Sequence, residues 1–217
     1  MNNRERGKHL AIRYYKKKDR RKLRAFNHDF PLPQYFKELI GDKKSVLIAD
    51  LGAGSICTLG NQWPGVELKI LASDLLADEY NEHWRNTKRT ILNPVTKQDM
   101  EALSYPDNAF DIVHCANALD HCENPRAAIA EMIRVCKPGG WVYLRHIQNE
   151  GSKENYHGFH QWNFDIDDDG EAFLWNKQLE QFGLEIFGSF NSEIRTEISN
   201  TMYPGEESVV SKLRKGE

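Results

Sequence analysis

The segment that most constrains the fold is residues 45–54, which read SVLIADLGAG. Its first half is apolar and rich in β-branched side chains, a pattern typical of a buried strand. Gly52 and Gly54 then allow a tight turn, and we expect a helix to begin near Ser55. Such a turn lets a ligand approach the backbone at the positive end of the helix. The segment therefore predicts a ligand site directly after a buried strand.

The composition is that of a globular protein with one domain. At 217 residues, with 40% apolar and 28% charged side chains, the chain is long enough to bury a core. Its sequence contains no apolar run long enough for a membrane span and no apolar segment after the basic N-terminus that would mark a secretory signal. The spacing of the cysteines fits neither a Cys-x-x-Cys pair nor a disulfide framework, so we expect reduced thiols in a cytoplasmic protein.

The charge is unevenly distributed along the chain. The net charge is −3, yet residues 1–25 carry eleven Lys and Arg against Glu5 and Asp19. Because good helix formers dominate there, residues 1–40 are expected to form a basic helical cap. Two roles are open for it: a solvated basic helix, or a lid that attracts an anionic substrate. Nucleic acid is an unlikely partner, since no base-stacking pattern accompanies the basic residues.

Strands and helices alternate along the chain as far as residue 147. This order predicts an α/β fold in a single domain, with a mostly parallel sheet and helices on both faces. After the first strand, further strands are expected at 66–74, 94–101, 111–115 and 141–147. Helices are expected at 34–40, 55–63, 78–90 and 126–136.

Residues 148–217 depart from this alternation and are expected to form the substrate side of the domain. Residues 151–160 read as a polar loop, and residues 161–175 as a hairpin with an Asp-Gly turn. A short helix is expected at 178–182. Strands near 184–190 and 209–213 are expected to close the sheet in antiparallel orientation.

Asp74 is the first candidate for a ligand contact outside the glycine turn. It ends the second expected strand, twenty residues after Gly54. A carboxylate at this position accepts hydrogen bonds from both hydroxyls of a ribose in nucleotide-binding folds. Order and spacing together therefore favour a ligand that contains a nucleoside.

Three motifs carry a resemblance to a known family. They are DLGAG at residues 50–54, PDNAFDIV at residues 106–113 and ALDHCENP at residues 118–125. In this order they resemble the class I S-adenosylmethionine (SAM)-dependent methyltransferases, and most closely the small-molecule enzymes of the ubiquinone and menaquinone type. The resemblance covers residues 46–147. Ile56 departs from the pattern, which often has a glycine at that position.

The resemblance implies a Rossmann-like class I methyltransferase fold with a mostly parallel seven-stranded sheet and an N-terminal helical lid. It also implies SAM as the cofactor. In the family, an acid like Asp50 holds the methionine amino group, an acid like Asp99 takes the adenine amino group, and an apolar neighbour like Met100 packs on the ring. The expected cofactor contacts are Asp50, Gly52, Ala53, Gly54, Asp74, Leu75, Asp99, Met100 and Asn117.

Histidines supply the candidates for chemistry on the acceptor. His121 follows the fourth strand, where a base could reach the acceptor, although this histidine often has a structural role in the resembling family. His146, at the end of the fifth strand, is the second catalytic candidate. His157 and His160 lie in the loop expected to cover the crevice, and with Trp162 and Tyr15 they are the expected substrate contacts. No metal is expected, because Asn117 stands where the quinone O-methyltransferases carry a metal-binding glutamate.

The sequence thus predicts a SAM-dependent methyltransferase acting on a small polar or glycan-type acceptor, at an oxygen of an anionic or sugar-like molecule. Two alternatives stay open: an N-methyltransferase for a small amine, and a SAM-binding scaffold protein without catalysis. Methylation of RNA ranks below these, since the Asn-Pro-Pro-aromatic motif of base N-methyltransferases is absent after the fourth strand.

Overall fold

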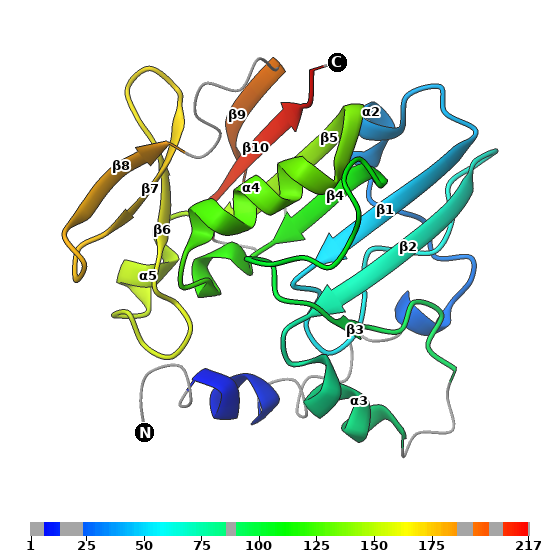
Figure 1. Cartoon of the computed structure of the whole chain (residues 1–217), viewed down its shortest axis with the longest axis horizontal. Coiled ribbons are helices and arrows are strands. Elements are labelled where there is room, and N and C mark those ends of the chain that lie inside the picture. Colours follow the sequence, from blue (N-terminus) through cyan, green and yellow to red (C-terminus); the bar gives the residue numbers. More distant parts are fainter. Residues whose placement is uncertain (1–6, 14–23, 86–89, 186–192, 200–205, 217) are drawn as a thin grey trace.

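A seven-stranded sheet forms the centre of the molecule, with strand order β3-β2-β1-β4-β5-β10-β9 (Figure 1). The structure is a computed structural model that describes residues 7–13, 24–85, 90–185, 193–199 and 206–216. The five strands from β3 to β5 are mutually parallel, and β10 and β9 add to them in antiparallel orientation. The strands are β1 (Ser45–Leu51), β2 (Glu67–Asp74), β3 (Thr96–Lys97), β4 (Phe110–Ala116), β5 (Cys136–Ile147), β9 (Glu193–Ser199) and β10 (Ser208–Arg214).

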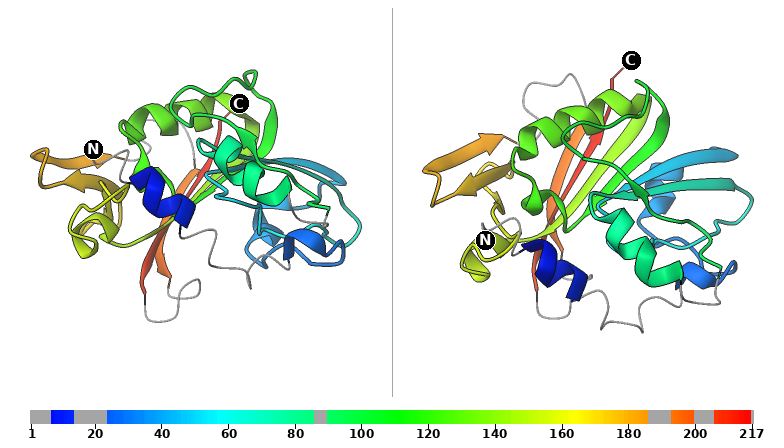
Figure 2. Two further views of the ribbon diagram at one scale, coloured as in Figure 1. Left: turned by 90° about the horizontal axis from the view of Figure 1, so that it is seen from below. Right: turned by 60° about the horizontal axis from the view of Figure 1, so that its bottom comes forward.

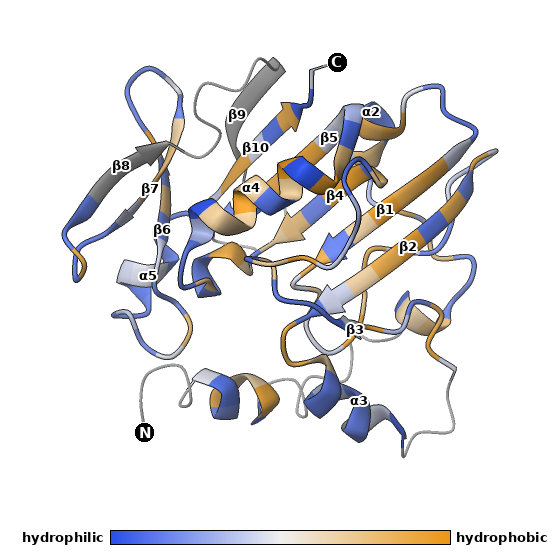
Figure 3. Ribbon diagram, in the orientation of Figure 1, coloured by the Kyte–Doolittle hydropathy of each residue, from blue (hydrophilic) through white to orange (hydrophobic). Residues whose placement is uncertain are grey.

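Helices cover both faces of this sheet, as the sequence predicts. Side chains of a strand alternate between its two faces. In β1, Ile48 packs with residues of α2, whereas its neighbour Ala49 packs with residues of α4. The apolar colouring of β1 and β4 in Figure 3 follows these two buried layers. The helical segments among the described residues are 7–13, the 3₁₀ turn at 24–26, α2 (Phe36–Ile40), α3 (Ala77–Arg85), the 3₁₀ turn η2 (Leu119–His121), α4 (Pro125–Val135) and α5 (Glu150–Lys153).

The sequence signals at the start of α4 explain where it begins. Asn124 caps the first turn by accepting a hydrogen bond from the backbone N–H of Ala127 (3.1 Å), and Pro125 occupies the first helical position. The helix ends at Val135, one residue before its expected end, because Cys136 already belongs to β5. Its buried side, which includes Ile129 and Met132, faces β4 and β5.

The helix expected at residues 55–63 is wrong, because this segment is an irregular loop. Ile56 packs beside Trp84, whereas Cys57 and Leu59 are buried in the α2 layer, so the apolar side chains point to two different places. Gly60 has φ +129°, and a Cβ there would lie 2.4 Å from the carbonyl oxygen of Pro31. The segment therefore packs closely against residues 30–32 and does not form a helix.

The predicted hairpin is confirmed, whereas the two elements expected directly after it are wrong. β6 (Asn163–Ile166) pairs with β7 (Ala172–Asn176) across a turn that contains Gly170. The helix expected at 178–182 is instead a turn followed by β8 (Gln181–Glu185), which pairs with β7. β9, rather than residues 184–190, pairs with β10, and residues 186–192 lie outside the described part of the chain. β10 confirms the last predicted strand.

The N-terminal helix (residues 7–13) lies below the carboxyl ends of β1, β2 and β4 (Figures 1 and 2). It packs closely on the loop after α5, where a Cβ added at Gly7 would lie 2.9 Å from the ring of Phe159. Tyr15 and the basic residues of segment 14–23 lie outside the described residues. None of the helices in the described ranges has the length and apolar character that crossing a membrane requires.

Candidate active site

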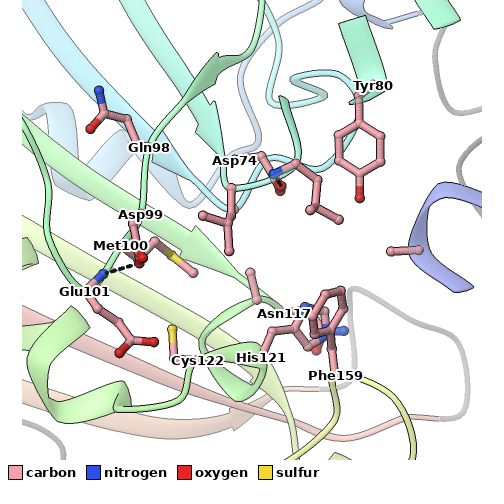
Figure 4. Close-up of a pocket in the computed structure, with 15 residues that line it drawn as sticks. Asp74, Tyr80, Gln98, Asp99, Met100, Glu101, Asn117, His121, Cys122 and Phe159 are labelled. Carbon is pink, nitrogen blue, oxygen red and sulfur yellow. Dashed lines mark hydrogen bonds between the residues drawn. The ribbon is translucent and has the colours of Figure 1, made fainter. Parts of the chain in front are cut away.

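A pocket opens at the carboxyl ends of β1, β2 and β4 (Figure 4). Its empty space is about 720 Å³, which includes the solvent at its open mouth. Ala11 of the N-terminal helix and Phe159 close one side of it. The predicted cofactor residues in its wall are Gly52, Asp74, Leu75, Asp99, Met100 and Asn117.

The glycine turn reaches the pocket only through Gly52. This residue has φ +68°, and a Cβ there would lie 2.3 Å from the Cβ of Ala118. The amide of Ala53 donates to the carbonyl oxygen of Ser73 (3.0 Å), and the amide of Gly54 donates to Oδ2 of Asp74 (2.9 Å). Ala53 and Gly54 therefore stabilise the turn. They were expected to contact the cofactor, but they lie outside the pocket wall.

Asp74 is fixed at the end of β2 by two backbone amides. Its Oδ2 accepts from Gly54, and its Oδ1 accepts from the amide of Leu76 (2.8 Å). Burial raises the pKa of this carboxyl group, although both hydrogen bonds act in the opposite direction. In Figure 4, Asp74 and Tyr80 lie on one side of the pocket, opposite Asn117, His121 and Phe159.

Asp50 does not line the pocket, because its carboxylate is buried next to His114. It is 5% exposed, and its Oδ1 accepts a hydrogen bond from Nδ1 of His114 (2.8 Å). Nε2 of His114 in turn forms a hydrogen bond with the hydroxyl of Tyr35 (3.2 Å). The sequence analysis missed this chain of contacts, for which the only local signal was a histidine within the apolar strand β4.

The acceptor end of the pocket is built around His121. Its ring lies 5.3 Å from Phe159 and 4.8 Å from His160, measured between ring centroids. Asp120 lies behind it, with Oδ2 at 2.8 Å from Nδ1 of His160 and 3.4 Å from Nε2 of His121. Burial lowers the pKa of His121, while the nearby Asp120 opposes this shift. The hydrogen bond to Asp120 raises the pKa of His160 to about 9 despite burial.

The other predicted side chains do not gather at the pocket. His146 is 1% exposed and stacks on Phe164 at 4.1 Å, so it belongs to the core rather than to the crevice. Trp162 is also buried, and its Nε1 donates to the carbonyl oxygen of Cys122 (3.0 Å). His157 is exposed and lies outside the pocket wall. The expected substrate wall is therefore reduced to His160, which stands behind His121, and to Phe159, which the sequence analysis did not select.

The burial of His146 predicts a loss of stability in acid. Desolvation lowers the pKa of His146 to about 3, with His121 acting in the same direction and Asp120 against it. The unfolded chain therefore binds this proton below about pH 6.5, whereas the native state does not. The free energy of unfolding, measured in urea, should fall for the wild type when the pH is lowered from 6.5 to 4.5. In His146→Leu this fall should be smaller by about 2 kcal/mol. His157→Leu, at an exposed position, should follow the wild type; equal pH dependence in all three proteins would contradict the prediction.

Part of the chain is similar in sequence to known proteins. Residues 49–144 match the family described as methyltransferase domain. A segment of 60 residues is 45% identical to the ubiquinone/menaquinone biosynthesis C-methyltransferase UbiE of Cupriavidus taiwanensis, covering 28% of this chain and 25% of the relative. A probable methyltransferase, ltbC of Aspergillus luteorubrus, is 52% identical over 49 residues, which are 21% of this chain and 17% of that protein. The matched segments thus span a quarter or less of the length of these relatives.

Solved structures show the same fold over nearly the whole chain. The putative methyltransferase of Haloferax volcanii, solved in a complex with the Trm112 methyltransferase activator, has a TM-score of 0.57 at 13% identity and covers 100% of this chain and 98% of that chain. A SAM-dependent methyltransferase from Aquifex aeolicus has a TM-score of 0.54 at 15% identity, covering 94% of this chain and 98% of that chain. Residues 49–144 are therefore similar to a methyltransferase domain, and the chain shares the fold of SAM-dependent methyltransferases.

Proposed function

We propose that this chain transfers the methyl group of SAM to a hydroxyl oxygen of a small polar acceptor. The observation that supports it best is the joining of two sets of side chains in one pocket. Asp74, Asp99 and Met100 line the part that suits a nucleoside, and His121 with Phe159 lines another part of the same wall. Both reactants would then meet at the carboxyl ends of the strands, where ligands bind in open α/β sheets.

The pocket wall fits the cofactor through its shape and its carboxylates. Gly52 has no Cβ in a place where one would clash with Ala118, so the backbone itself borders the pocket. In this proposal Asp74 accepts hydrogen bonds from the ribose hydroxyls, Asp99 accepts one from the adenine amino group, and Met100 packs on the ring. Bound SAM supplies the electrophile, a methyl group on a positively charged sulfur.

His121 is the proposed proton acceptor for the acceptor hydroxyl. Its Nε2 is buried and lies 3.4 Å from Oδ2 of Asp120, so Nδ1 is the ring nitrogen proposed to take the proton on the pocket side. Burial lowers the pKa of His121, which keeps the ring neutral. When the acceptor oxygen bonds to the methyl carbon, the carbon–sulfur bond breaks and its electron pair goes to sulfur. The hydroxyl proton moves to His121, whose positive charge Asp120 then stabilises.

The class of acceptor follows from weaker signals. The aromatic side chains Tyr80 and Phe159 favour an acceptor with a ring, and the eleven basic residues of segment 1–25 favour an anionic or sugar-like one. A second candidate is methylation at a ring carbon, because the matched curated relatives include enzymes named as C-methyltransferases. Loss of a hydroxyl proton activates a phenolic ring carbon as well, so the same residues would serve both reactions.

Methyl transfer from ¹³C-methyl SAM to a panel of phenols, sugar phosphates and amines tests the proposal, with product NMR identifying the methylated atom. We expect an O-methyl product. His121→Gln should lower kcat by a factor of about 10²–10⁴, since that is the usual contribution of a general base. It should change the Kd for SAM less than threefold.

His157→Gln, an exposed histidine of the neighbouring loop, is the matched control and should keep wild-type turnover. A C-methyl or N-methyl product would replace the proposed reaction with the corresponding alternative. SAM binding without turnover on any acceptor of the panel would favour the scaffold alternative.

A further inference from the structure

A cluster of metal-ligating side chains lies next to the acceptor end of the pocket. Asp120, His121 and His160 each offer one ligand atom, and these three atoms all lie within 4.8 Å of one another. Asp120 and His121 belong to η2, whereas His160 follows α5, so folding brings them together across forty positions of the sequence. The carboxylate lies between the two imidazole rings.

Several buried polar atoms of this cluster lack a hydrogen-bond partner among the residues that the structure describes. They are Oδ1 of Asp120, Nε2 of His121 and Oε2 of the adjacent Glu150. Asp120 is 1% exposed, and Oε1 of Glu150 lies 3.8 Å from Nδ1 of His160. Polar atoms buried without a partner cost free energy, and native proteins rarely tolerate several in one place. A bound cation would satisfy the oxygen and nitrogen atoms together.

We infer that Asp120, His121 and His160 bind a divalent first-row transition metal ion such as Zn²⁺. Two imidazole nitrogens and one carboxylate oxygen are a donor set that these ions accept, whereas Mg²⁺ and Ca²⁺ prefer oxygen ligands alone. With bonds of about 2.0–2.2 Å in a tetrahedral arrangement, ligand atoms lie about 3.3–3.6 Å apart, so the most distant pair of the cluster must approach by up to about 1.5 Å when the ion binds. The ion replaces the proton shared by His160 and Asp120, and the carboxylate of Glu150 adds negative charge nearby.

An ion at this place keeps the proposed methyl transfer, on which this step rests, but replaces His121 as the group that activates the acceptor hydroxyl. His121 lines the pocket, so a metal held by these three residues lies at the acceptor end. Three protein ligands leave coordination positions open, as in catalytic zinc sites. An acceptor hydroxyl that occupies one of them loses its proton to water more readily. His121 is then a metal ligand, and water takes the proton that His121 would otherwise accept.

Metal binding by the full chain tests this inference. The purified protein is stripped with EDTA, dialysed, and titrated with Co²⁺ by visible absorption and with Zn²⁺ by calorimetry. We expect one ion per chain with a Kd in the micromolar range or below, and a visible Co²⁺ spectrum. His160→Ala and Asp120→Asn should weaken binding at least 100-fold. The exposed His157→Ala is the matched control and should bind as the wild type does.

Folding of the variants is checked by SAM titration and thermal unfolding. The His160 side chain is 28% exposed, so His160→Ala decides the question even if the buried Asp120→Asn does not fold. Binding by His160→Ala that equals the wild type, or no stoichiometric binding by the wild type, would overturn the metal site. Intact SAM binding and turnover in that case would leave the proposed function standing with His121 as the base. Metal binding without SAM binding would overturn the proposed function alone.

Discussion

Gly52→Ala is expected to lower the free energy of unfolding by about 2–5 kcal/mol and to abolish SAM binding. Two separate effects contribute. Gly52 has φ +68°, a conformation that costs a residue with a Cβ about 1–2 kcal/mol. The new Cβ would also lie 2.3 Å from the Cβ of Ala118, and overpacking of this kind typically costs about 1–3 kcal/mol more. Gly52 and Ala118 both line the pocket. A shift of either backbone that relieves the clash would therefore enter the space proposed for the cofactor.

Two matched variants separate the clash from the backbone strain. Gly65 has nearly the same φ, +71°, but a Cβ there meets nothing within 4 Å, so Gly65→Ala should lose only about 1–2 kcal/mol and bind SAM normally. Adding Ala118→Gly to Gly52→Ala removes the clashing atom and should recover part of the lost stability. Urea unfolding and isothermal titration with SAM measure both quantities. Equal losses for Gly52→Ala and Gly65→Ala would show that the contact with Ala118 is unimportant.

Asp74→Ala is expected to weaken SAM binding by a factor of about 100 or more, because each hydrogen bond to a charged group contributes about 1.5–3 kcal/mol. The same carboxylate holds the amides of Gly54 and Leu76, so the variant should also lose stability. Asp74→Asn keeps an acceptor oxygen and the side-chain volume, so its affinity for SAM should lie between that of the wild type and that of Asp74→Ala. Asp78→Ala removes an exposed carboxylate that pairs with Lys97, and it should bind SAM as the wild type does.

Calorimetry with SAM and with its demethylated product measures these affinities on folded protein. Equal affinity of the wild type and Asp74→Ala would move the cofactor away from this pocket. No binding by folded wild type would mean that the turn after β1, which continues into a loop rather than a helix, no longer supports a cofactor site.

Elements with a clear local pattern were predictable from the sequence. β1, β2, β4, β5 and α4 follow apolar periodicity and capping residues, which act over a few positions. The loop at 55–63 was not predictable in this way, because Ile56 and Cys57 are buried in different layers and Gly60 is fixed by contact with Pro31. The turn at 177–180 likewise depends on pairing between β7 and β8 rather than on helix propensity.

The candidate site shows the same division. Residues at strand ends, such as Asp74 and Asn117, were predictable because the carboxyl ends of parallel strands meet at one edge. His146 also follows a strand pattern, but its side chain points into the layer occupied by Phe164, a partner that joins only in the folded chain. The contact of Asp120 with His160 joins positions forty residues apart, and no spacing rule of the sequence contains it.

The N-terminal helix has a consequence for the exchange of product for fresh cofactor. Its described part, residues 7–13, contacts the loop at Gly158 and Phe159, and these contacts hold it over the pocket. Ala11 forms part of the pocket wall, and a ligand that fills the pocket therefore adds to those contacts. We expect amide hydrogen exchange at residues 7–13 to slow when SAM binds, and departure of the product to wait for this helix to move away.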